Sequence, residues 1–154
     1  MVEIDHGFTT EMKYAVAGMF TNGLSSKIFP KLKDQWYNVA KVYAVCDEKK
    51  DVYNGDISFQ SLAELPEQID VLIIVHKEDK TMLLLQEVED LPYRPSLWFM
   101  PRTLTPKVRK RVNEIGLLYA ESCLMGHMKR GGLGKLNLHN VHSYISHWKK
   151  IGKQ

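Results

Sequence analysis

Short, continuous runs of apolar residues alternate along this chain with longer segments whose apolar residues recur at helical spacing. The runs have the length of strands, and their near-continuous apolar character is typical of strands that are buried on both faces. Such strands belong in a parallel sheet covered by helices, because parallel neighbours need long crossover connections. The expected strands are 14–18, 41–47, 70–76, 96–101 and, running into a loop, 116–125.

Three helices are expected between and after these strands, at 25–34, 78–91 and 105–116. Pro30 is expected in the first turn of the first helix, where a missing N–H is tolerated. The third helix has the strongest end signals, with Thr105 as N-cap, Pro106 at the first helical position and Gly116 after the last turn. Repeated strand–helix units with short connections predict right-handed crossovers and a doubly wound, mainly parallel α/β sheet.

The length of 154 residues suits a single domain, which we place at 1–128. A flexible joint, KRGGLGK at 129–135, begins a C-terminal segment, 129–154, that carries six Lys and Arg residues and no acid. An apolar stripe on this segment predicts an amphipathic helix packed on the same domain or on a partner subunit, as in a homodimer: Val141, Tyr144, Ile145, Trp148 and Ile151. We interpret its charges as a solvated helix end; nucleic-acid binding is a weaker alternative because no recognition-helix motif accompanies them.

Several classes of protein are disfavoured by the same sequence. The longest apolar run, VLIIV at 71–75, is too short to cross a bilayer, and the N-terminus lacks the apolar core of a secretory signal. The two cysteines, Cys46 and Cys123, cannot form a disulfide framework. We therefore expect a cytoplasmic protein with no membrane partner.

The strand ends indicate where a ligand would bind. In an open α/β sheet, ligands bind beyond the carboxyl ends of the strands. The residues expected at that edge, and therefore as nucleotide-binding residues, follow the first four strands: Gly18, Met19, Phe20, Thr21, Asn22, Ser25, Ser26, Lys27, Cys46, Asp47, His76, Lys77, Met100 and Arg102.

The loop after the first strand resembles a phosphate-binding turn only in part. The dinucleotide fingerprint has three glycines, whereas this loop has Gly18 and Gly23 with bulky residues between them. Loop amides, hydroxyls and Lys27 could meet a phosphate, with Gly18 allowing close approach of the backbone. An equally weighted alternative is a plain turn whose serines cap a helix starting at Ser25 or Ser26.

Asp47 bears on the choice of nucleotide. An acid at the end of the second strand is where NAD-binding domains hold ribose hydroxyls. The same carboxylate would oppose the phosphorylated ribose of CoA unless Lys49 or Lys50 turns in to offset it. Asp47 as an ordinary turn residue is the third interpretation. The missing third glycine and the absence of a substrate-carrying domain argue against NAD.

From about 14 to 125 the chain resembles the small bacterial CoA-binding domain proteins, which are related to the nucleotide-binding domain of the succinyl-CoA synthetase α chain. The resemblance rests on the order of several pieces: YAVAG, KVYAV, the segment YNGDISFQSLAELPEQIDVLIIV, Trp98, VNEIGL and Cys123. It implies a Rossmann-like fold and non-covalent binding of CoA, acyl-CoA or a related adenine nucleotide, with NAD as the alternative cofactor.

Three departures from the family pattern lie at the proposed ligand edge. The first loop has Gly18-Met19-Phe20 in place of Gly-Ala-Ser, Cys46-Asp47 replaces Asn-Pro, and Met100-Pro101-Arg102 replaces a glutamine and a glycine. We expect residues 46–50 to flank the adenosine, and Lys27 and Lys77 to act as counter-charges.

A catalytic set is weakly supported, so we favour a binding protein over an enzyme. Cys123 and His127 are four residues apart and would form a thiolate–imidazole pair only if helical. This pair carries the alternative function, a small NAD-dependent or cysteine-using enzyme acting as reductase or acyl carrier. No metal site is expected, because on a helix His142 and His147 would lie about 140° apart.

Overall fold

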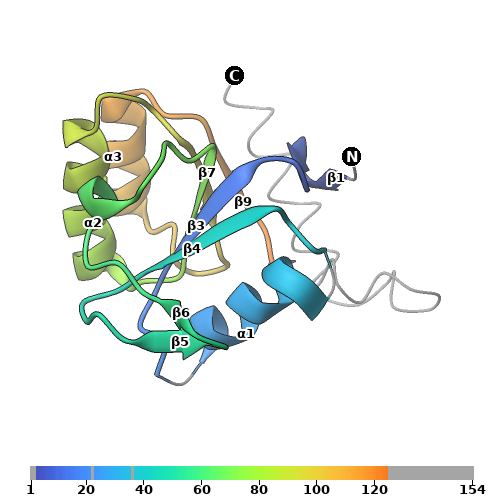
Figure 1. Ribbon diagram of the computed structural model, residues 1–154. Coiled ribbons are helices and arrows are strands. Elements are labelled where there is room, and N and C mark those ends of the chain that lie inside the picture. Colours follow the sequence, from blue (N-terminus) through green and yellow to red (C-terminus); the bar gives the residue numbers. More distant parts are fainter. Residues whose placement is uncertain (1–2, 22, 36, 125–154) are drawn as a thin grey trace.

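A computed structural model describes residues 3–21, 23–35 and 37–124. Its centre is one sheet of five parallel strands in the order β4-β3-β7-β8-β9 (Figure 1). The strands are β3 (Lys13–Ala17), β4 (Lys41–Val45), β7 (Val71–Ile74), β8 (Ser96–Phe99) and β9 (Tyr119–Glu121). All five strands expected from the apolar runs are confirmed. The direction of winding reverses at β3, which lies between β4 and β7, and this reversal creates a switch point at the carboxyl edge.

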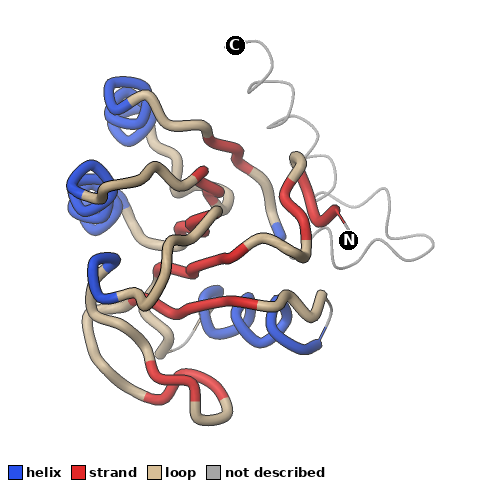
Figure 2. Tube along the Cα trace, turned by 45° about the horizontal axis from the view of Figure 1, so that its top comes forward, coloured by secondary structure: helices blue, strands red, loops and turns tan. Residues whose placement is uncertain are grey.

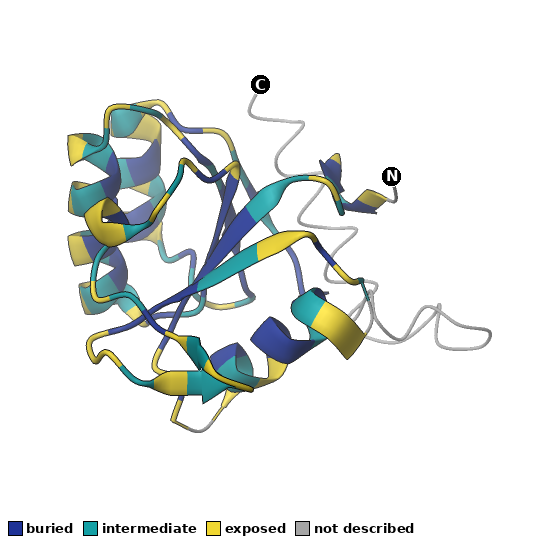
Figure 3. Ribbon diagram, in the orientation of Figure 1, coloured by how far each residue is buried: buried dark blue, intermediate teal, exposed yellow. Residues whose placement is uncertain are grey.

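Helices cover both faces of the sheet, as the doubly wound prediction requires (Figure 2). Helix α1 (Leu24–Pro30) packs on one face, and α2 (Glu78–Asp90) and α3 (Pro106–Ile115) pack on the other. Successive strand residues point to opposite faces. In β3, Tyr14 and Val16 join the core under α1, and Ala15 and Ala17 join the core under α2 and α3. Figure 3 shows most of this strand in the colour of buried residues. This double burial explains why the strands are apolar at nearly every position.

Helix α1 begins and ends differently from the prediction. It starts at Leu24 after Gly23, no side chain caps it, and Pro30 is its last residue, where the sequence placed this proline in the first turn. Proline lacks an N–H and crowds the carbonyl of the residue four before it. The chain widens directly afterwards into a π-helical turn, Lys31–Gln35, which accommodates that disturbance.

The ends of α3 agree with the prediction. Thr105 Oγ1 accepts a hydrogen bond from the Val108 N–H at 3.4 Å, Pro106 occupies the first turn, and Gly116 takes a left-handed conformation with φ of 82°. These features fix the connection between β8 and β9.

Two small hairpins outside the main sheet were not predicted. The first pairs β1 (Glu3–Asp5) with β2 (Phe8–Thr9), and its Phe8 ring packs on Trp98 at 5.4 Å between ring centroids. The second pairs β5 (Asp51–Tyr53) with β6 (Asp56–Ile57) through an Asn54-Gly55 turn in which both residues have positive φ, as in a type I′ turn.

The crossover from β4 to β7 is therefore built from a hairpin and a short 3₁₀ turn, Leu62–Glu64, in place of a full helix. Phe59, in this crossover, pairs in parallel with the end of β4: it receives a hydrogen bond from Cys46 N–H at 2.9 Å and donates one to Ala44 O at 2.8 Å. This pairing brings residues 58–60 next to the carboxyl edge.

The C-terminal segment, with its predicted joint, apolar stripe and histidines, lies outside the described residues. Within the described part of the chain, none of the helices combines the length and the apolar character that crossing a membrane requires.

Candidate functional site

The parallel strands bring the predicted residues to one edge of the sheet. Gly18 follows β3, Cys46 and Asp47 follow β4, His76 follows β7 and Met100 follows β8. These positions surround the switch point between β4, β3 and β7. Asn22, which belongs to the same predicted set, lies outside the described residues.

The loop after β3 is held by contacts of its own. Gly18 N–H donates to Val45 O at 3.1 Å, and Phe20 N–H donates to Ser25 Oγ at 3.1 Å. Phe20 has a left-handed backbone, with φ of 56°, and its buried ring packs edge-on against Phe29. The Ser25 hydroxyl thus closes the loop and does not cap the helix.

Gly18 is required by packing inside this loop. A Cβ atom on Gly18 would overlap Ser25 Cβ and lie 2.7 Å from Ser25 Oγ. The glycine therefore lets the loop approach helix α1, which is one of the roles of glycine in strand–helix turns of this kind. The prediction that Gly18 leaves room for a phosphate finds no support in this geometry.

Polar groups remain at the loop surface. Ser26 Oγ is buried and has no hydrogen-bond partner among the described residues. The Lys50 ammonium group donates to Met19 O at 3.2 Å, which places a cation on the loop. Thr21 and Lys27 are exposed, and the Met19 side chain is 60% exposed. The surface of this loop therefore carries cations, whereas the unpaired Ser26 hydroxyl of α1 is buried.

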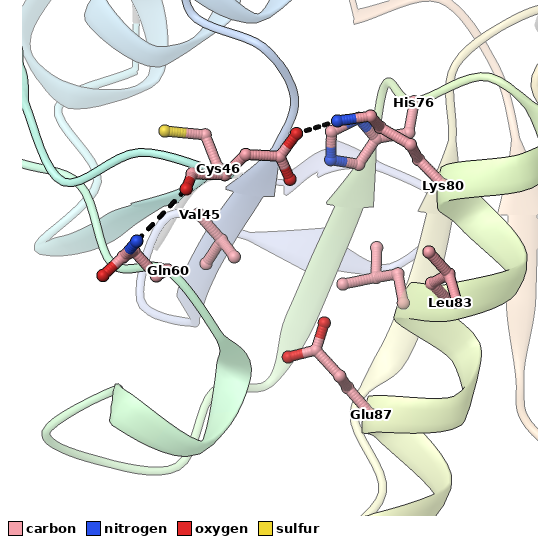
Figure 4. Close-up of a pocket in the computed structure, with 9 residues that line it drawn as sticks. Val45, Cys46, Gln60, His76, Lys80, Leu83 and Glu87 are labelled. Atoms are coloured by element: carbon pink, nitrogen blue, oxygen red, sulfur yellow. Dashed lines mark hydrogen bonds and ion pairs between the residues drawn. The ribbon is translucent and has the colours of Figure 1, made fainter.

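A pocket of about 150 Å³ opens beside the loop, between the end of β4, the Gln60 segment, the end of β7 and helix α2 (Figure 4). Nine residues line it: Val45, Cys46, Asp47, Gln60, His76, Lys80, Leu83, Leu84 and Glu87. Aliphatic side chains form one part of the wall, and polar groups form the rest. This mixture is typical of sites for small organic molecules.

The polar groups of the pocket are mostly tied to one another. Asp47 makes an ion pair with the Lys80 ammonium group, and its carbonyl accepts a hydrogen bond from Gln60 Nε2 at 3.2 Å (Figure 4). Glu87 Oε1 accepts from Leu62 N–H at 3.0 Å. The lysine that pairs with Asp47 is therefore Lys80, and not Lys49 or Lys50, the two lysines that the sequence analysis considered for this role.

His76 is the exception among these polar residues. It is only 8% exposed, its side chain makes no hydrogen bond to another described residue, and its ring nitrogens stay accessible to solvent where the residue lines the pocket. Its main chain is fixed, because Thr81 Oγ1 donates to His76 O at 3.0 Å. Burial lowers the pKa of His76 below its usual value. The ring is therefore neutral at pH 7, with one donor and one acceptor nitrogen.

Sequence reasoning found three residues of the pocket, Cys46, Asp47 and His76, and missed those of helix α2. A signal was present: Lys80, Leu83, Leu84 and Glu87 follow the i, i+3, i+4, i+7 spacing of one helix face. That spacing shows that the residues share a face, and the tertiary structure shows that this face borders the pocket.

Other predicted residues do not reach the pocket. Lys77 and Arg102 are exposed and Met100 is fully buried in the core, and none of the three lines the cavity. Arg102 lies in a turn with φ of 70°. These residues stand at the edge of the sheet but apart from the pocket.

The two cysteines are both buried. Cys46 Sγ donates to Glu48 O at 2.9 Å, and in Figure 4 its sulfur is directed away from His76. Cys123 follows β9, and its proposed partner His127 lies outside the described residues. In the described part of the chain, His, Cys, Asp and Glu side chains form no cluster suited to a metal ion.

The parallel sheet, the helices on both faces and the strand order define a Rossmann-like α/β domain. The chain belongs to the CoA-binding domain family, whose model matches residues 12–129. The resemblance stated from the sequence is thereby confirmed. None of the curated protein sequences compared with this chain matches it.

Solved structures share the fold at low sequence identity. A hypothetical protein from Pyrococcus horikoshii is 22% identical, with a TM-score of 0.64 over 78% of this chain and 83% of its own. A conserved hypothetical protein from Pyrococcus furiosus is also 22% identical, with a TM-score of 0.61 over 74% of this chain and 97% of its own. A Thermus thermophilus protein is 24% identical, with a TM-score of 0.61 over 77% and 90% of the two chains.

Proposed function

We propose that the protein binds CoA or an acyl-CoA non-covalently at the carboxyl edge of the sheet, with the adenine ring in the pocket lined by His76. The observation that carries the proposal is the His76 imidazole, which makes no hydrogen bond to another described residue and lines a pocket at the switch point of a domain whose family is described as CoA-binding. A few polar groups that converge on a partly apolar pocket are typical of a small-molecule site.

The size of the pocket limits what enters it. Pockets that enclose a whole drug-sized ligand measure about 300–1,000 Å³. A cavity of about 150 Å³ is large enough for a small flat aromatic group. We therefore assign it to the heterocycle, and the rest of CoA would extend over the edge of the sheet.

The chemistry of the walls suits adenine. Val45, Leu83 and Leu84 offer aliphatic surface to the faces of a flat ring. His76 and Gln60 can donate to ring nitrogens or accept from the exocyclic amine. The diphosphate would then lie toward the loop after β3, where the Lys50 ammonium group contacts Met19 O and offers a counter-charge.

The alternative cofactor, NAD, is favoured by one residue, Asp47 at the end of β4. Its carboxylate is paired with Lys80, which reduces its capacity to hold a ribose diol. The enzymatic alternative depends on Cys123, whose thiol is buried. CoA binding remains the better supported proposal.

Calorimetric titration of the full chain with CoA, acetyl-CoA and NAD tests this proposal. We expect CoA or acetyl-CoA to bind more tightly than NAD. Leu83 stands at the pocket and is 70% exposed, so Leu83→Trp should obstruct the entrance without disturbing the core. We expect this variant to lose about tenfold or more in CoA affinity.

Gln86→Trp is the matched control, since Gln86 is an exposed residue of the same helix that does not line the pocket. Native-like CoA binding by the Leu83 variant would place the ligand elsewhere. Tighter binding of NAD than of CoA would reverse the assignment.

A further inference from the structure

We propose that Lys80 makes this site selective for a nucleotide that carries a phosphate on its ribose over one with a free ribose diol; the inference rests on the proposed function. Lys80 comes from the first turns of α2 and is the only cation among the described residues that line the pocket. Its ammonium group pairs with the Asp47 carboxylate, and both residues line the same pocket as His76 (Figure 4).

The Lys80–Asp47 pair is poised to open. The two side chains are 42% and 69% exposed, and exposed ion pairs are weak because water solvates both partners. An ammonium group has three donors, and one carboxylate does not use them all. Lys80 can therefore turn to a ligand while Asp47 returns to water.

A phosphate monoester is the anion that competes best for Lys80. It carries a charge between −1.5 and −2 at neutral pH, whereas Asp47 carries one negative charge. The neighbouring His76 is neutral and contributes no competing charge. Glu87, the other acid of the pocket, stands at the opposite end and is held by Leu62 N–H.

A ribose with a free diol gains less binding free energy beside Lys80 and Asp47. Such a ribose needs the Asp47 carboxylate as acceptor, and that carboxylate already holds Lys80. Two ligands that differ only in this phosphate, CoA and dephospho-CoA, therefore isolate the contribution of Lys80.

Calorimetric titration of the full chain with CoA and dephospho-CoA tests the inference. We expect native protein to bind CoA at least about tenfold more tightly, as a charge-assisted contact predicts. Lys80→Met should weaken CoA binding and leave dephospho-CoA unchanged or bound somewhat more tightly, because Asp47 becomes free to accept from the ribose diol, so that the ratio falls to about one or below. Lys80→Arg, which keeps the cation, should retain the preference, and Asp47→Asn should strengthen CoA binding.

Lys77→Met is the control, since Lys77 is an exposed cation of the same region that does not line the pocket. It should leave the ratio at its native value. Equal affinities of native protein for the two ligands, or equal weakening of both by Lys80→Met, would overturn this inference while CoA binding stands. Failure of native protein to bind either ligand would instead overturn the proposed function.

Discussion

The contact between Gly18 and Ser25 yields a sharp test of how the loop after β3 is built. The methyl group that Gly18→Ala adds would overlap Ser25 Cβ and lie 2.7 Å from Ser25 Oγ. Its next neighbour, Val75 Cβ, would be at an ordinary contact distance of 3.5 Å. Overpacking of this kind typically costs about 1–3 kcal/mol. A small gain from restricting the unfolded chain offsets part of it, roughly 0.4–1 kcal/mol. We therefore expect Gly18→Ala to lower the free energy of unfolding by about 1–2 kcal/mol.

Ser25 offers two matched partners for a double-mutant cycle. Ser25→Ala removes the hydroxyl that accepts from Phe20 N–H but keeps the Cβ that Gly18→Ala overlaps. Ser25→Gly removes both atoms. Each of the two Ser25 variants should lower the free energy of unfolding by about 1–3 kcal/mol, because the buried Phe20 N–H loses its acceptor. Ser25→Gly should lower it by about 1 kcal/mol more, because glycine is unfavourable within a helix. Only Ser25→Gly should cancel the cost of Gly18→Ala, with a coupling of about 1–3 kcal/mol.

Urea unfolding followed by circular dichroism measures all the terms of this cycle. Additive effects of Gly18→Ala and Ser25→Gly, within about 0.5 kcal/mol, would refute the packing argument. Titration of the Gly18→Ala/Ser25→Gly double variant with CoA tests whether Gly18 also matters for ligand binding. If Gly18 in fact leaves room for a ligand, the double variant would be about as stable as Ser25→Gly alone but would lose CoA affinity.

Three further predictions follow from individual residues. Because burial lowers the pKa of His76, the unfolded chain takes up a proton while the native imidazole is still neutral, so stability should fall as the pH drops below about 6.5. His76→Gln should remove this contribution, which is at most about 1.4 kcal/mol per pH unit, and identical urea-unfolding profiles of both proteins against pH would contradict the assignment. A thiol reagent should label neither Cys46 nor Cys123 until the protein unfolds, because both are buried; fast labelling of native Cys123 would revive the cysteine-using enzyme. Gly55→Ala should cost about 1 kcal/mol in thermal or urea unfolding because φ is 86°, and an unchanged midpoint would argue against the type I′ turn.

Much of the fold was predictable because its determinants are local. The strands are continuous apolar runs since each is buried on both faces, and the caps Thr105 and Gly116 are chosen by the backbone within a few residues. The start of helix α1 was predicted wrongly, because it depends on a contact with the loop that precedes the helix. Ser25, a good N-cap by its chemistry, is recruited by the Phe20 N–H, and Gly23 occupies the position before the helix.

Some residues of the candidate site could likewise be placed from the sequence, and others depend on the tertiary structure. Parallel strands end at one edge wherever they fall in the chain, so Cys46, Asp47 and His76 could be placed together from the sequence. The partner of Asp47 could not be predicted from the sequence. The choice between nearby lysines and Lys80, which is 33 positions away, depends on how α2 packs. The sequence by itself determined the five strands of the main sheet, helices α2 and α3, and the edge at which the strands end. The tertiary structure alone decided which face of α2 borders the pocket and that the His76 side chain forms part of its wall, since both depend on packing between segments distant in the chain.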